Sequence, residues 1–327
     1  MPSKPANIKK NLHPLNKHNS GYDFDFLVTK HTLLAKFLIN DQQSTRIDFA
    51  NYDAVVALNT ALLKAYYRID HWQIPTGYLC PAIPGRVDYI HYLAQLLDTE
   101  FNHARQSGCT KTLQHAGLEV LDIGTGASCI YPILGQRCYQ WRFTASDIDP
   151  VSVTCAKELV AVNRGLSKKI SIVLQKNTGC FFKGVIQNEH RFTLSLCNPP
   201  FHASLEKALS GNSRKRANLA KSNGLAKPLE NKTALNFGGQ QAELFCSGGE
   251  LTFITKMMLE SVEYKNQVLF FSCLVSKSAH LKTLQSCLSK LNADYVKVIK
   301  MSQGQKISHF IAWSFLDATQ RAAWFKL

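Results

Sequence analysis

The chain has 327 residues, of which 45% are hydrophobic and 10% aromatic. This composition allows a large buried core and fits one main domain with a smaller appendage. The formal charge of +15 and the pI near 9.4 favour a polyanionic partner, nucleic acid before an anionic membrane surface. The longest apolar run, around residues 268–275, is far shorter than the about 18 residues that cross a membrane, so no spanning segment is expected.

Residues 1–20 are polar and basic and contain no acidic residue. We predict a flexible arm here, in which Lys9 and Lys10 contact nucleic-acid phosphates; the alternative is an inert tail. The stretch has no apolar segment of the kind that secretory signals contain, so a cytoplasmic location is expected. The ten cysteines never form a C-x-x-C pair, and therefore neither a metal site nor disulfides are predicted.

Apolar residues recur at helical spacing over residues 53–66, where Asn51 or Asp53 could cap the first turn. Prolines and glycines between residues 75 and 85 interrupt the chain, and a second amphipathic helix is predicted from Val87 onward. Three parts follow: residues 1–44 form the arm and the start of an N-terminal module, residues 45–104 a helical substrate-binding module, and residues 105–327 the main domain.

Beyond Leu118, short apolar runs alternate with helical stretches, as in a mostly parallel sheet covered on both faces. The connection 301–308 between the last two runs is too short for a crossover helix, so these strands must pair antiparallel. The pattern is typical of the class I methyltransferase layout, an α/β Rossmann-like sheet of seven strands with the last one antiparallel. The predicted strands cover residues 118–123, 142–147, 170–174, 192–197, 267–275, 293–300 and 310–316.

A glycine-rich turn follows the first of these strands, with the sequence Asp122-Ile-Gly124-Thr-Gly126-Ala-Ser128. Glycines permit a sharp turn and close approach to a ligand, so a nucleotide-like cofactor is predicted to contact Asp122, Gly124, Gly126 and Ser128. The dinucleotide fingerprint needs Gly or Ala at position 129, where this chain has Cys129, which weakens a nicotinamide interpretation.

Two acidic residues, Asp147 and Asp149, stand at the end of the second strand. A carboxylate at this place can accept hydrogen bonds from both ribose hydroxyls of an adenosine. Asp147 is the preferred candidate and Asp149 the alternative, because Asp149 precedes Pro150 and could instead cap the next helix.

The sequence Asn198-Pro199-Pro200-Phe201 follows the fourth strand, at the edge of the sheet where ligands bind. The two prolines stiffen the turn, and its carbonyls and the Asn198 side-chain oxygen can accept hydrogen bonds from an amine. The exocyclic amine of adenine is a poor nucleophile, and two acceptors would favour its tetrahedral form. Phe201 is expected to stack on the target base. Cys197 is expected to be a small buried filler rather than a nucleophile.

The stretch 202–236 is long, polar and strongly basic. Its place directly after the predicted catalytic turn favours an RNA-clamping lid over an inert insertion. The residues expected to contact RNA here are Arg214, Lys215, Arg216 and Lys221.

Seven longer strings belong together as a pattern: residues 74–75, 78–81, 83–90, 122–132, 197–201, 235–244 and 311–315. They resemble one family, the adenine-N6 methyltransferases of large-subunit ribosomal RNA known as methyltransferase F, with eukaryotic relatives that act on small nuclear and messenger RNA. The resemblance covers roughly residues 45–316. It implies S-adenosylmethionine as cofactor and 23S ribosomal RNA or an assembly intermediate as partner. It also implies Arg86 on the cofactor carboxylate and Thr178 near the adenine; Asp147 stands where the family often has Glu.

Two other functions fit part of the pattern. Similar Asn-Pro-Pro-aromatic turns act on protein glutamine amides, although the charge of +15 argues against that substrate. A catalytically silent RNA-binding assembly factor would keep the fold, but the intact Asn198 and Phe201 disfavour it. The oligomeric state is open, with a monomer expected.

Overall fold

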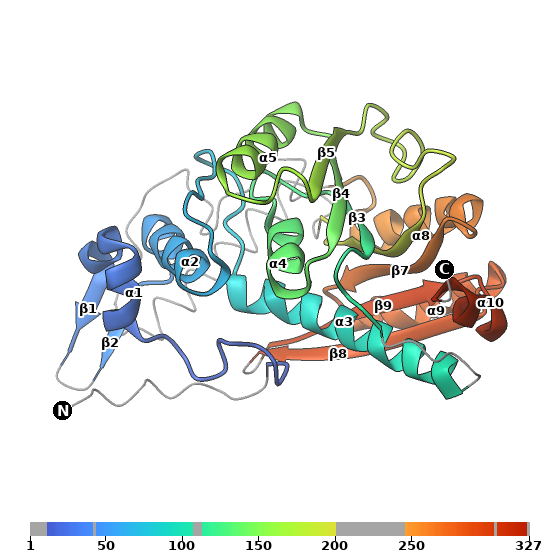
Figure 1. The fold of residues 1–327 in the computed structure, drawn as a ribbon, viewed down its shortest axis with the longest axis horizontal. Helices are drawn as coiled ribbons and strands as arrows, with labels where there is room; N and C mark the ends of the chain where they lie inside the picture. Colours follow the sequence, from blue (N-terminus) through green and yellow to red (C-terminus); the bar gives the residue numbers. More distant parts are fainter. Residues whose placement is uncertain (1–11, 42–43, 107–112, 201–245, 304–305, 326–327) are drawn as a thin grey trace.

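The computed structural model describes residues 12–41, 44–106, 113–200, 246–303 and 306–325. Its centre is a seven-stranded sheet in the order β5-β4-β3-β6-β7-β9-β8 (Figure 1). The first five of these strands run parallel, whereas β9 is antiparallel to both β7 and β8. This confirms the predicted α/β fold with its antiparallel last strand. The strands are β3 (Glu119–Ile123), β4 (Arg142–Asp147), β5 (Ile170–Leu174), β6 (Phe192–Cys197), β7 (Val268–Val275), β8 (Tyr295–Gln303) and β9 (Lys306–Ser314).

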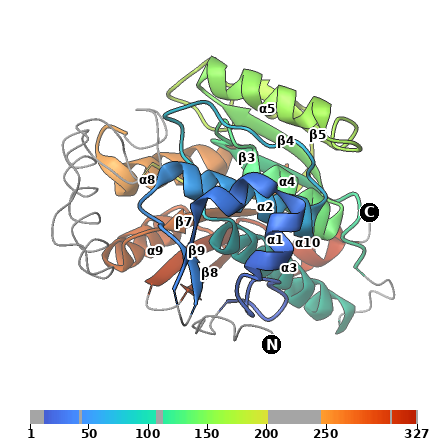
Figure 2. The same cartoon turned by 90° about the vertical axis from the view of Figure 1, so that its left-hand side faces the viewer.

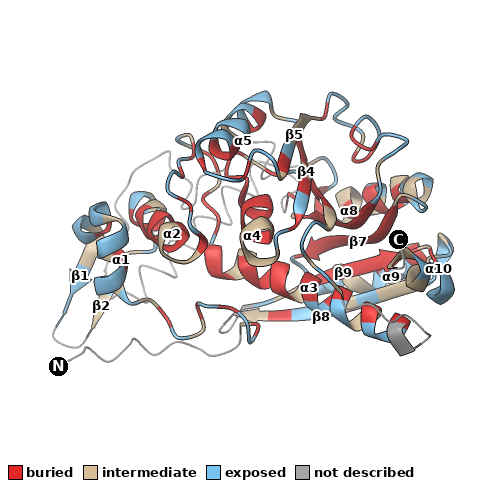
Figure 3. Ribbon diagram, viewed as in Figure 1, coloured by how far each residue is buried: buried red, intermediate tan, exposed pale blue. Residues whose placement is uncertain are grey.

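Helices cover both faces of the sheet, because alternate residues of its buried strands point to opposite sides. Phe310 and Ala312 of β9 join the core under α3 (Ile83–Gln106), α4 and α5, while Ile311 and Trp313 join the core under α8 and α9. Figure 3 shows the buried residues concentrated on β7 and the facing sides of the helices. The helices of the main domain are α4 (Ile130–Tyr139), α5 (Pro150–Val162), α8 (Gly249–Ser261), α9 (Leu281–Lys290) and α10 (Ala318–Trp324), with short 3-10 turns at Val262–Tyr264 and Ser278–His280.

The N-terminal module contains a hairpin as well as helices. Figure 2 faces this module, with α1 and α2 in front of α3. Strands β1 and β2 pair antiparallel with Leu38 opposite Ile47, which the sequence reasoning missed because each strand has only three residues. The elements are α1 (Phe24–Lys30), a 3-10 turn (Thr32–Phe37), β1 (Leu38–Asn40), β2 (Thr45–Ile47), α2 (Tyr52–Tyr67) and α3 (Ile83–Gln106).

Helix α3 begins at Ile83, four residues before the predicted start. Pro84 and Gly85 do not break the helix as the pattern predicts, because a proline is tolerated in the first turn, where its missing N–H has no intrahelical partner. At the start of α2 the Asn51 side chain accepts from the N–H groups of Asp53 and Ala54, so Asn51 rather than Asp53 is the cap.

The predicted flexible arm does not extend to residue 20. His13, Asn16 and His18 are buried. The Asn16 amide donates to the Pro84 carbonyl at 2.9 Å and to Asp88 Oδ1 at 3.0 Å, which fastens this segment to the first turns of α3. A sequence pattern of basic residues and prolines does not predict these side-chain hydrogen bonds.

Gly135 in α4 offers a test of how tightly the helix packs on the sheet. A Cβ atom at this position would lie 2.5 Å from Phe143 Cζ and 3.0 Å from Trp141 Cε3. Both rings are buried, so Gly135→Ala should lower the free energy of unfolding by about 1–3 kcal/mol despite the better helix propensity of alanine. Urea denaturation measures the change, with the exposed Lys157→Ala on α5 as control. An unchanged midpoint would mean that the Phe143 ring can move aside.

No described helix is both long and apolar enough to cross a membrane.

Candidate active site

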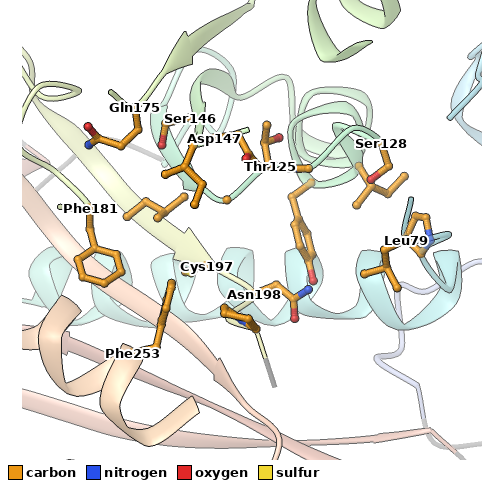
Figure 4. A pocket seen from close by; sticks show the side chains of 18 of the residues that line it. Leu79, Thr125, Ser128, Ser146, Asp147, Gln175, Phe181, Cys197, Asn198 and Phe253 are labelled. Atoms are coloured by element: carbon orange, nitrogen blue, oxygen red, sulfur yellow. Dashed lines mark hydrogen bonds between the residues drawn. The ribbon is translucent and has the colours of Figure 1, made fainter. Parts of the chain in front are cut away.

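A pocket opens at the carboxyl ends of β3, β4 and β6, the edge at which open α/β sheets bind ligands (Figure 4). Its walls come from the glycine turn after β3, the acidic end of β4, the segment after β5 and the corner after β6. The N-terminal module contributes Leu79, Pro81 and Arg86, and α8 contributes Phe253. The pocket therefore combines both parts of the chain.

The glycine turn has the geometry that the sequence predicted. Gly124 and Gly126 line the pocket with φ values of +74° and +65°, in the left-handed region that favours glycine. The Gly124 and Thr125 N–H groups donate to the Ser146 carbonyl at 2.9 and 3.0 Å, so the turn is fixed to the neighbouring strand. Ser128 also lines the pocket, and α4 begins after it, at Ile130.

The two acidic residues after β4 have different surroundings. Asp147 lines the pocket and accepts hydrogen bonds from the N–H groups of Gly126 and Asp149 at 2.8 and 2.9 Å. Burial raises the pKa of its carboxyl, against the opposing effect of these hydrogen bonds. Asp149 is not among the lining residues but caps α5 through Val151 and Ser152. Burial would raise the pKa of Asp149, but hydrogen bonds from Tyr78 and Ser152 lower it below its usual value. The geometry thus favours Asp147 for a ligand.

The corner after β6 presents an unused acceptor. Asn198 and Pro200 line the pocket, and Pro199 is buried. The Asn198 Oδ1 atom is buried and accepts no hydrogen bond from any described residue. A buried acceptor without a partner costs free energy, so a ligand donor at this place would stabilise the site. Cys197 is buried, as expected, with one side toward the pocket.

Arg86 lines the pocket from the first turn of α3. Its Nη1 donates to the Tyr131 hydroxyl at 2.7 Å, and its guanidinium carbon lies 5.5 Å from the centre of the Tyr131 ring. Burial raises the pKa of Tyr131 to about 12, although Arg86 opposes this shift. Since no ion pair to Arg86 occurs in the described part of the chain, its charge is available for an anionic ligand group.

Asp122 lies beneath the turn rather than in the wall of the pocket. Its side chain is fully buried, and neither carboxyl oxygen meets a hydrogen-bonding partner among the described residues. Burial raises the pKa of Asp122 to about 7; the nearby Thr125 hydroxyl opposes the shift and Asp147 adds to it. Asp122 can therefore change its charge near neutral pH.

The segment after β5 brings Gln175, Thr178, Cys180 and Phe181 to the pocket. Thr178, which entered only through the family resemblance, is thus placed in the wall. Phe181 meets Phe253 of α8 edge to face, with ring centres 4.8 Å apart. Sequence reasoning missed Phe181 and Phe253, because they come from elements far apart in the chain and no motif marks them. Leu79 lies in the family-like string 78–81, which carried no prediction of a role for this residue.

Some predicted site residues lie outside the described residues. These are Phe201, Lys9, Lys10, Arg214, Lys215, Arg216 and Lys221, together with the whole stretch 202–236. In the part of the chain that the structure covers, no group of three His, Cys, Asp or Glu side chains could hold a metal ion.

The strand order and the pocket at the carboxyl ends of β3 and β4 define a class I methyltransferase. A family model described as RNA methyltransferase matches residues 6–317. The chain belongs to the ribosomal RNA large subunit methyltransferase F family of RNA methyltransferases. It is 52% identical over 310 residues to the member from Colwellia psychrerythraea, covering 94% of this chain and 99% of the relative. The member from Psychromonas ingrahamii is 49% identical over 320 residues, 97% of this chain and 99% of the relative.

Solved structures of human METTL16 have the same fold. Its catalytic domain in complex with MAT2A 3′UTR hairpin 6 has a TM-score of 0.72 at 26% identity, covering 94% of this chain and 98% of that chain. Its N-terminal domain in complex with SAH has a TM-score of 0.71 at 25% identity, with coverages of 94% and 99%.

Proposed function

We propose that this RNA methyltransferase uses S-adenosylmethionine to methylate N6 of an adenine in 23S ribosomal RNA. The observation that carries the proposal is the buried Asn198 Oδ1 atom, which accepts no hydrogen bond from the residues that the structure describes and lies in a pocket that also contains the glycine turn. The named activity of the bacterial relatives, as ribosomal RNA large subunit methyltransferase F, supports the choice of RNA. The same membership favours RNA over the amide of a protein glutamine.

The residues present fit a nucleoside cofactor with an amino acid tail. Asp147 would accept from the ribose hydroxyls, and Thr178 would lie near the adenine. Arg86 would bind the cofactor carboxylate by exchanging its hydrogen bond to Tyr131 for a charged partner. Gly124, Gly126 and Ser128 would lie along the cofactor, with Asp122 charged beneath them. When bound, S-adenosylmethionine supplies a methyl group already activated on a positively charged sulfur.

Asn198 and the proline corner act on the acceptor. The amide oxygen of Asn198 and a backbone carbonyl of the corner would accept the two N–H groups of the adenine amine. This holds the nitrogen lone pair out of conjugation with the ring and toward the methyl donor. Because such transfer depends on alignment more than on a strong base, a rigid corner suits it. Phe201 is proposed to stack on the extruded base.

The RNA partner also fits the charge of +15, since each phosphate neutralised by Lys or Arg releases a counterion. The contacts proposed for Lys9, Lys10, Arg214, Lys215, Arg216 and Lys221 depend on residues outside the described ones. A ribosomal substrate implies a cytoplasmic place of action.

The test uses labelled S-adenosylmethionine with ribosomal RNA from a strain that lacks the gene, and in parallel with a glutamine-containing release-factor peptide. We expect label on the large-subunit RNA, recovered as N6-methyladenosine after nuclease digestion. Label on the peptide, or on another RNA base, would contradict the proposal. No label on either substrate would favour the silent assembly factor.

A further inference from the structure

Glu260 holds the segment between β5 and β6 from outside the pocket. It lies in the last turn of α8, and its carboxylate accepts from three successive backbone N–H groups. Phe181 donates to Oε2 at 2.7 Å, while Phe182 and Lys183 donate to Oε1 at 2.9 and 2.8 Å. Charge-assisted hydrogen bonds of this kind are about twice as strong as neutral ones. One side chain therefore fixes the backbone at the end of a segment that carries pocket residues.

The same segment is closed at its other end. The Gln175 amide donates to the Lys183 carbonyl at 2.9 Å, and its oxygen accepts from the Asn177 N–H at 2.9 Å. The Gln175 N–H donates to the Asp147 carbonyl at 2.8 Å, which joins the segment to β4. Residues 175–183 thus form a ring that Gln175 closes and Glu260 attaches to α8.

Helix α8 reaches the pocket through a second residue on the same face. Phe253 and Glu260 are seven residues, or about two helical turns, apart. Phe253 packs against Phe181 inside the pocket, while Glu260 binds the Phe181 N–H from behind. Without the Glu260 carboxylate, Phe181 would be held only by its ring contacts. The backbone of residues 181–183 would lose its attachment to α8, and the position of Thr178 in the same segment would be less well fixed.

We propose that Glu260 is a positioning residue for the adenosine half of the cofactor site, acting through Thr178 and Phe181. The inference rests on the proposed function, because it assigns these two residues to a nucleoside. It separates two parts of the pocket: Figure 4 places Leu79 and Ser128 on the side away from Phe181. Arg86 is hydrogen-bonded to Tyr131, in the helix that begins just after Ser128. Glu260 should therefore affect the nucleoside and not the amino acid tail.

The experiment measures binding by calorimetry for two ligands, S-adenosylhomocysteine and 5′-methylthioadenosine, of which the second lacks the amino acid tail. Glu260→Ala should weaken both ligands by a similar factor, on the order of tenfold, since charged hydrogen bonds are lost. Glu260→Gln keeps the shape and one acceptor oxygen and should fall between. Arg86→Leu should weaken S-adenosylhomocysteine alone. The exposed Glu263→Gln is the matched control on the adjoining turn.

Turnover separates positioning from a general loss of structure. At saturating cofactor, Glu260→Gln should keep kcat near the wild-type value while its cofactor KM rises and its affinity for RNA stays unchanged. If Glu260→Ala does not fold, Glu260→Gln carries the test. Wild-type affinity of both Glu260 variants for 5′-methylthioadenosine would overturn the inference, as would weakening of S-adenosylhomocysteine alone. If the wild-type protein binds neither ligand, the proposed function itself is wrong.

Discussion

Asn198→Ala should lower kcat by about 10²–10³-fold or more while the affinity for S-adenosylmethionine stays within about threefold of wild type. The reason is the isolation of Asn198 Oδ1, which is buried in the pocket and accepts no hydrogen bond from a described residue. Its removal leaves no gap in the network that holds the glycine turn, because that turn is fixed by Ser146 and Asp147. Single-turnover rates and equilibrium binding measure the two quantities separately.

Two further variants sharpen this test. Asn198→Asp keeps the size and an acceptor oxygen, so it should bind the cofactor and transfer the methyl group faster than Asn198→Ala. Asn188→Ala, at an exposed position between β5 and β6, is the control for removal of an asparagine and should leave kcat unchanged. Wild-type turnover by Asn198→Ala would remove this residue from the mechanism.

The sheet could be predicted from the sequence because its strands are short, apolar and separated by helical stretches. The predicted bounds of β4, β5 and β6 agree with the structure. The hairpin of β8 and β9 is longer than predicted, since antiparallel pairing continues through polar residues such as Ser302 opposite Ile307. The packing of His13 and Asn16 on α3 could not be predicted, because it depends on hydrogen bonds to partners about 70 residues away.

The site divides in the same way. Four of its residues lie at or directly after the ends of parallel strands: Gly124, Gly126, Asp147 and Asn198. Because these strand ends lie at one edge of the sheet, the sequence predicts that the four residues line the same pocket. Arg86 lies in a helix of the N-terminal module, and only the family resemblance pointed to it. Phe253 and Glu260 belong to a helix whose role depends on its contacts with residues 175–183. The local sequence pattern predicts site residues that directly follow a strand. Site residues on a helix that packs against a distant segment can be identified only from the tertiary structure.

Asp122 should make stability depend on pH in a direction opposite to most carboxylates. Its pKa is about 7 in the folded protein and near the ordinary aspartate value in the unfolded chain. Between these values the folded state binds the extra proton, so the free energy of unfolding falls as pH rises and levels off above about 7. Asp122→Asn has no carboxyl to ionise, so its folded state does not lose stability in this way as pH rises. The stability of the variant relative to wild type should therefore increase by about 2–3 kcal/mol between pH 5 and pH 8.

Urea denaturation at pH 5, 6, 7 and 8 measures this difference, with the exposed Glu189→Gln as the control for removal of a carboxylate. A constant difference between Asp122→Asn and wild type would mean that the carboxyl is hydrated or paired.

The same residue links pH to binding, because a positively charged ligand near Asp122 favours its ionised form. Affinity for S-adenosylmethionine should rise with pH through about 7 in the wild type and change less in Asp122→Asn. A rise of equal size in both proteins would assign the proton to another group of the pocket, such as Asp147, whose pKa is also raised by burial.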